Sequence, residues 1–285
     1  MTLINLKAVL SQGVITTSHK FVLLARQFKM TETNDNSSGI TALKKNEIQV
    51  YWTASKCILD HVQILLHLPY FFLAPLLLMP KQAEASHLSQ NFVNSCPYCR
   101  MLHGELGRMA GLSETYKLND LGQIHPDDVK EVSLFAMFGS SFKATNGANS
   151  EVLDKIQGEI QAEYGRSVAK ATRGLSFFLL WGRMSGNTIN NFLFETMGKF
   201  KAGSNTLFEL IFVLWYGPLF FIIVIVSTLF KAMPRVPRII WILLSLVLAT
   251  VASLWIIPFS LVCLLLSPVA NVFSKTEKAK DEKQD

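Results

Sequence analysis

Residues 84–112 of this chain read EASHLSQNFVNSCPYCRMLHGELGRMAGL, and this stretch decides the fold. Apolar side chains recur at helical spacing on both sides of the central Asn-Ser-Cys-Pro segment, which predicts two helices joined by a short turn. Asn94 and Ser95 are suitable helix N-caps, and Pro97 suits the first helical turn. Gly111 suits the end of the second helix, because glycine readily adopts the left-handed conformation found there.

The flanking chain also has helical periodicity. Further helices are predicted at 126–138, 150–172 and 175–198. Residues 58–79 are strongly apolar but are interrupted by Pro69 and Pro75, so we expect one or two buried or membrane-hugging helices there rather than a spanning one. The sequence shows no strand-like alternation bounded by turns, and the predicted fold class is all-α.

Two long stretches near the C-terminus, 210–230 and 239–266, contain no charged residue. Each is longer than the ~20 residues that a membrane-spanning helix needs, and a short basic segment joins them. The sequence therefore predicts a helical membrane hairpin over 207–266. The expected organisation is an N-terminal segment and polar linker at 1–50, a helical domain at 51–203, the hairpin, and a charged tail at 267–285.

Composition supports attachment to a membrane. Half of the residues are hydrophobic, and the formal net charge is +6. The basic residues are scattered or flank apolar runs, without an Arg/Lys stripe interleaved with aromatics, so a nucleic-acid partner is not predicted. An anionic membrane surface accounts better for the positive charge. The four cysteines are too sparse for a secreted disulfide framework, and two of them form one close pair.

The pattern Glu84–x11–Cys96–x2–Cys99–x3–His103 is suited to thiol redox chemistry. A nucleophilic thiolate needs a pKa below the usual ~8.5, and the start of a helix favours an anion. His103 lies one helical turn after Cys99, where it can take the thiol proton, and Glu84 can orient the imidazole. Peroxide converts a thiolate to a sulfenic acid, which a second cysteine condenses to a disulfide.

The same pattern resembles the signature of the alkylhydroperoxidase D-like (AhpD-like), carboxymuconolactone decarboxylase superfamily. The similarity is clear over EASHLSQNFVNSCPYCRMLHGELGRMAGLS and looser over 55–200, where GRMSGNTINNFL is similar to an asparagine-containing late helix of that family. The resemblance implies an all-helical fold that associates into trimers or hexamers. It also implies that Cys99 is the peroxidatic cysteine and Cys96 its resolving partner, with Glu84 and His103 as the proton relay.

Two features depart from that family. Tyr98 stands where the best-studied members carry a histidine, and those members lack a two-helix membrane anchor. The anchor favours a membrane-derived substrate such as a lipid hydroperoxide. Decarboxylase activity is not expected, because members that have it generally lack the cysteine pair.

We therefore expect a membrane-anchored, thiol-dependent hydroperoxide reductase or dithiol oxidoreductase that needs no cofactor. The expected partners are a peroxide substrate, a lipoyl- or thioredoxin-type dithiol reductant, the lipid bilayer and further copies of the chain. A hairpin leaves both of its ends on one side of the membrane, and a dithiol is best kept reduced in the cytosol. The redox domain is therefore expected to face the cytosol.

Other interpretations of the same residues remain open. A zinc site would need four ligands, and Cys96, Cys99 and His103 supply three, with His87 available as a fourth. His87 is otherwise expected to be an ordinary helix residue, like His67. Both cysteines are also compatible with an inert core. In that case the chain would be a non-catalytic, membrane-bound scaffold or binding protein on the same fold.

Overall fold

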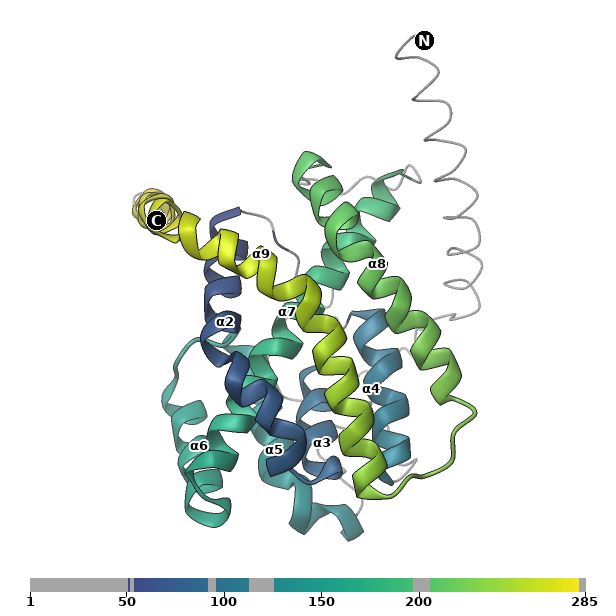
Figure 1. Cartoon of the computed structure of the whole chain (residues 1–285). Coiled ribbons are helices and arrows are strands. Elements are labelled where there is room, and N and C mark those ends of the chain that lie inside the picture. Colours follow the sequence, from purple (N-terminus) through teal and green to yellow (C-terminus); the bar gives the residue numbers. More distant parts are fainter. Residues whose placement is uncertain (1–50, 52–53, 92–95, 113–125, 197–205, 282–285) are drawn as a thin grey trace, which may run out of the picture. The chain divides into compact units, whose positions relative to one another are not determined.

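The computed structural model of the chain describes residues 51, 54–91, 96–112, 126–196 and 206–281, which belong to one compact unit (Figure 1). All of the regular structure in these ranges is helical, which confirms the all-α class there. The segment predicted at 1–50 and the N-cap candidates Asn94 and Ser95 lie outside the described residues.

The helices described are α2 (Ala54–Leu77), α3 (Pro80–Gln90), α4 (Pro97–Ala110), α5 (Pro126–Ala144), α6 (Glu151–Tyr164), α7 (Arg166–Thr196), α8 (Thr206–Phe230) and α9 (Arg238–Asp281). Proline is the first residue of α3, α4 and α5, a position where its missing N–H removes no helical hydrogen bond.

Two helix ends show how local sequence sets the boundaries. Gly111 ends α4 in the left-handed conformation with φ 81°, as predicted. Gly165, with φ 94°, separates α6 from α7. The single helix predicted over 150–172 is therefore wrong in extent, because Gly165 breaks it and the chain restarts as one long helix.

The number of candidate membrane spans differs from the prediction. Leu207–Phe230 and Arg238–Asn271 contain the two predicted spans, but Ala54–Leu77 is also long and apolar enough to cross a membrane. The expectation of a shorter, non-spanning segment at 58–79 is corrected, because the helix continues through Pro69 and Pro75. Helices of membrane proteins accommodate proline where neighbouring helices and local adjustments satisfy the freed carbonyl groups. Three candidate spans therefore replace the predicted pair.

Contacts at one end of the bundle fix the direction of these helices. Arg238 at the start of α9 donates to the Leu76 carbonyl oxygen near the end of α2 over 3.4 Å. Arg108 in α4 donates to the carbonyl oxygen of Phe230 at the end of α8 over 2.7 Å. Figure 1 shows α9 between α2 and α8, with α4 beside α8. The C-terminal end of α4 thus lies beside the connection between α8 and α9.

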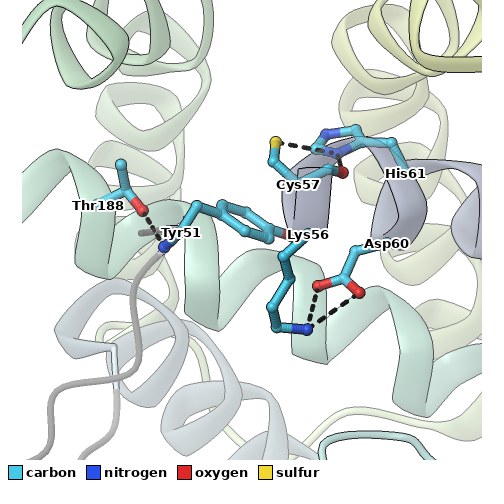
Figure 2. Close-up of polar contacts among 6 residues, drawn as sticks. All are labelled: Tyr51, Lys56, Cys57, Asp60, His61 and Thr188. Atoms are coloured by element: carbon cyan, nitrogen blue, oxygen red, sulfur yellow. Dashed lines mark hydrogen bonds and ion pairs between the residues drawn. The ribbon is translucent and has the colours of Figure 1, made fainter. Parts of the chain in front are cut away.

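The start of α2 is fixed by polar contacts within the bundle (Figure 2). The backbone N–H of Tyr51 donates to Oγ1 of Thr188 in α7 over 3.1 Å. Two turns into α2, Nδ1 of His61 donates to the Cys57 carbonyl oxygen at 2.7 Å. The other ring nitrogen of His61 lies 2.9 Å from the Tyr216 hydroxyl in α8. The Tyr51 bond ties the residue that precedes α2 to α7, and the His61–Tyr216 contact joins α2 to α8.

The outer faces of α8 and α9 are rich in exposed apolar side chains. The most exposed include Leu207, Leu214, Leu229, Leu243, Leu254 and Leu265. Soluble monomers rarely expose apolar surface on this scale. Contact with lipid is the environment that suits these faces.

Candidate functional site

Two helices bring the predicted acid and imidazole together. Glu84 lies in α3 and is 1% exposed, and His103 lies in the second turn of α4. Nδ1 of His103 is 2.9 Å from Oε2 of Glu84. Because an ionised carboxylate only accepts hydrogen bonds, Nδ1 carries the hydrogen, and Nε2 is left as the nitrogen that can accept a proton.

The carboxyl group of Glu84 stays ionised despite its burial. Burial alone would raise its pKa, but the neighbouring imidazoles of His103 and His87 lower the pKa to about 2. The 2.9 Å hydrogen bond from His103 is the closest of these contacts. The site therefore holds a buried, oriented anion at neutral pH.

The two cysteines lie at the start of α4, as predicted. Cys96 is the N-cap residue, and its Sγ accepts the backbone N–H of Cys99 over 3.5 Å. The hydrogen bond of the Cys99 thiol to Cys96, followed by burial, raises the pKa of Cys99 well above its usual value. Two donors thus converge on the Cys96 sulfur, while Cys99 holds its proton. Both cysteines are buried and unpaired.

Helix α7 packs directly on both sulfurs through two glycines. A Cβ placed on Gly182 would lie 3.4 Å from Sγ of Cys99. A Cβ placed on Gly186, one turn later, would overlap Sγ of Cys96 and come within 2.9 Å of the Phe220 ring. The close approach of α7 to the thiol pair thus requires the absence of a side chain at Gly186.

Arg183, between these glycines, is a functional candidate that the sequence analysis did not identify. Its side chain is fully buried, and Nη1 donates to the Gln90 carbonyl oxygen over 3.1 Å, while Nε and Nη2 have no hydrogen-bond partner. Burial lowers the pKa of Arg183 to about 10, so the guanidinium is charged at neutral pH. Its charge also acts to lower the pKa of Cys99. A buried, incompletely paired cation beside two thiols favours a thiolate.

Cys99, Glu84 and His103 line one cavity of about 130 Å³, together with apolar side chains of α2, α7, α8 and α9. Among these are Trp181, Phe220 and Trp241. A cavity needs about 10–15 Å³ to hold one water molecule, so this cavity has room for a segment of an acyl chain. The ring of Tyr98, beside the thiols, is 5.2 Å from that of Phe220 near the middle of α8. The thiol pair therefore lies level with the middle of α8.

The structure gives His87 a role that the sequence did not predict. Its ring centroid is 3.9 Å from that of His103, and its Nδ1 is 3.5 Å from Oε2 of Glu84. His87 is therefore part of the site. The spacing Glu84–x2–His87 places the two side chains on one helical face, and this is the signal that identifies the pair.

Asn190 and Asn191 of α7 connect helices and are not among the residues that line this cavity. The Asn190 side-chain oxygen accepts the Tyr98 hydroxyl at 2.9 Å. The amide of Asn191 donates to Glu209 of α8 at 2.6 Å. These two residues therefore make polar contacts between helices.

No protein-family model, curated protein or solved structure matches this chain. The resemblance to the alkylhydroperoxidase D-like superfamily thus rests on the residues of the signature and stays a prediction.

Proposed function

We propose that this chain is a membrane-anchored, thiol-dependent hydroperoxide reductase of the alkylhydroperoxidase D-like type, or a dithiol oxidoreductase that uses the same cysteine pair. One observation carries the proposal: Cys99 and the hydrogen-bonded pair of Glu84 and His103 line the same apolar cavity. This arrangement combines a nucleophile, a proton acceptor and a group that orients the acceptor.

The proposed reaction uses each of these groups. His103 takes the Cys99 proton, and the thiolate attacks the outer oxygen of a hydroperoxide ROOH and breaks the O–O bond. The alkoxide leaves as ROH with the proton returned by His103, and Cys99 becomes a sulfenic acid. The Cys96 thiol then attacks the sulfenic sulfur, which forms the Cys96–Cys99 disulfide and releases water. The substrate gains two electrons, and the thiol pair loses two.

Cys99 suits the peroxidatic role because it borders the cavity, whereas Cys96 is fully buried and is not among the cavity's lining residues. The hydrogen bonds favour the other assignment, with Cys96 as the peroxidatic cysteine, because both of them donate to the Cys96 sulfur. We assign the peroxidatic role to Cys99 because a substrate in the cavity can reach Cys99 and not Cys96. The nearby Arg183 guanidinium stabilises a thiolate on either sulfur.

The disulfide returns to two thiols when an external dithiol reduces it and is itself oxidised to a disulfide. A lipoyl- or thioredoxin-type molecule supplies this chemistry. We further propose that the chain forms a homo-oligomer and that the domain that carries the thiols faces the reducing cytosol. Both features come from the family resemblance and the redox state that a dithiol needs.

A lipid-derived hydroperoxide is the proposed substrate class. Three candidate spanning helices, α2, α8 and α9, contribute to the cavity wall, and the thiols lie level with the middle of α8. The apolar cavity wall favours binding of a substrate with an acyl chain, because such a substrate buries apolar surface there, over binding of a small polar peroxide.

Thiol counting tests the proposal. The reduced chain in detergent should lose about two thiols when treated with one equivalent of an alkyl hydroperoxide, and a dithiol should restore them. Cys99→Ser should abolish the fast loss. A parent chain whose thiols react no faster than those of an unfolded peptide would instead support the non-catalytic scaffold.

A further inference from the structure

We propose that Glu84, His87 and His103 form a binding site for a divalent transition-metal ion of the Zn²⁺ class. Each residue offers one ligand atom, and the three atoms all lie within 4.8 Å of one another. Two imidazoles and one carboxylate are a ligand set that catalytic zinc sites use. This ligand set contains no cysteine and differs from the zinc site that the sequence left open.

The two distances from Glu84 to the histidines are close to those of a bound zinc ion. Ligand atoms about 2.0–2.1 Å from a tetrahedral zinc ion lie about 3.3 Å from one another. The distances from Oε2 of Glu84 to Nδ1 of His103 and of His87 are 2.9 and 3.5 Å and bracket that value. Shifts of a few tenths of an ångström therefore bring these two pairs to the separation that zinc needs. The ligand atoms of His87 and His103 lie within 4.8 Å of each other, and the ion would draw them closer.

The second observation is the state of Nδ1 in His87. This atom is buried and has no hydrogen-bond partner, although it is turned toward Glu84. Buried polar atoms are rarely left without a partner in native proteins. A bound ion gives this nitrogen the partner that it lacks.

The surroundings leave one coordination position available. All three residues line the cavity beside Cys99. A zinc ion with three protein ligands keeps its fourth position for water or another small ligand, and the cavity is where that ligand would lie. The helices α3 and α4 carry the ligands, so the site lies on regular structure and not on a loop.

The ion and the hydrogen bond between His103 and Glu84 exclude each other, because both use Nδ1 of His103. Ion binding displaces the hydrogen on that nitrogen. The metal-bound form therefore lacks the His103–Glu84 hydrogen bond of the proposed peroxide reaction, and the ion would act as its inhibitor. Ion binding itself does not depend on that proposed function.

The test uses the full-length chain in detergent with Cys96→Ser and Cys99→Ser, so that thiols contribute nothing. Dialysis against Zn²⁺ followed by elemental analysis gives the stoichiometry, and Co²⁺ gives a visible spectrum that reports coordination. His87→Ala, His103→Ala and Glu84→Gln are compared with His67→Ala, which removes a histidine of α2 outside the three-residue group. Circular dichroism and gel filtration identify variants that do not fold.

We expect one Zn²⁺ per chain in the background protein and in His67→Ala, with intense Co²⁺ bands typical of tetrahedral coordination. His87→Ala should reduce the stoichiometry to near zero, and so should each other ligand variant that folds. A background protein without stoichiometric metal would overturn the proposal, as would binding that survives in folded His87→Ala. Zn²⁺ bound by the parent chain, which keeps both cysteines, but not by the background protein would replace the proposed site with a thiolate site.

Discussion

Nδ1 of His103 lies 2.9 Å from Oε2 of Glu84, and this hydrogen bond joins α4 to α3 in the wall of the cavity that Cys99 also lines. It orients an imidazole from a carboxylate that is almost completely buried. The bond therefore leaves Nε2 of His103 as the ring nitrogen that can accept a proton, in a side chain that lines the same cavity as Cys99.

Glu84→Gln is expected to slow peroxide-driven thiol loss by about 10²-fold, the lower range for a general acid–base group. An amide has no negative charge and does not hold His103 in the same protonation state. The second-order rate constant from stopped-flow measurement checks this prediction. Glu105→Gln removes a carboxylate of α4, the helix that carries His103; this carboxylate pairs with Arg108 at 2.9 Å, and the rate of the variant should match the parent. Equal rates for both variants would remove Glu84 from the mechanism.

Gly186→Ala is expected to lower stability by about 1–3 kcal/mol, because the new methyl overlaps Sγ of Cys96 and the close-packed core must shift. Disulfide formation should slow as Cys96 moves. Gly158→Ala, on the exposed side of α6 with open space around it, should instead stabilise by about 0.5–1 kcal/mol. Thermal unfolding in detergent measures both. A Gly186→Ala chain as stable as Gly158→Ala would show that α7 does not approach the thiols as described.

Lys143→Met is expected to change the pH dependence of stability. Burial and the nearby Arg183 lower the pKa of Lys143 to about 7 in the folded chain, against an ordinary value of 10.5. Between these values the unfolded chain binds more protons, so the stability of the parent rises with pH from about 7 toward 10.5. The variant should lose this rise, with its advantage over the parent greatest below pH 7.

Melting temperatures of parent and variant between pH 6 and pH 9 measure this difference. Lys155→Met, on the exposed face of α6, serves as the control and should keep the slope of the parent. Parallel curves for the parent and Lys143→Met would mean that Lys143 titrates in its ordinary range.

The third candidate span leads to a topology prediction. If α2 crosses the membrane, its two ends face opposite sides, and its C-terminal end faces the same side as the α8–α9 connection. In a chain whose native cysteines are replaced by alanine, a membrane-impermeant maleimide should label Met79→Cys and Ala232→Cys from one side. Ala54→Cys should be labelled from the other side. Labelling of Ala54→Cys and Met79→Cys from the same side would return α2 to the non-spanning helix expected from its sequence.

Much of this fold follows from local sequence signals. Gly111 and Pro97 mark the limits of α4, and the charge-free stretches 210–230 and 239–266 lie within α8 and α9. Local signals were misleading in α2, where Pro69 and Pro75 suggested a break. The packing of α2 against α7 and α9 outweighs the tendency of proline to interrupt a helix. The local sequence of α2 does not reveal these tertiary contacts.

The site also contains residues that local sequence predicts and residues that only the tertiary structure reveals. The spacing of Glu84, Cys96, Cys99 and His103 is readable because the residues lie within two consecutive helices. Arg183 and the glycine surface of α7 are distant in sequence, and only tertiary packing brings them to the thiols. The cavity has the same origin, since its wall combines side chains of six helices.

Mass spectrometry of the thiol pair after one turnover tests the central claim most directly. Reduced chain in lipid nanodiscs would receive one equivalent of a phospholipid hydroperoxide and be quenched by alkylation. We predict a Cys96–Cys99 disulfide in the parent, a trapped sulfenic acid on Cys99 in Cys96→Ser, and one equivalent of phospholipid alcohol. Unmodified cysteines with intact hydroperoxide would contradict the account, and a sulfenic acid confined to Cys96 in Cys99→Ser would reverse the roles assigned to the two sulfurs.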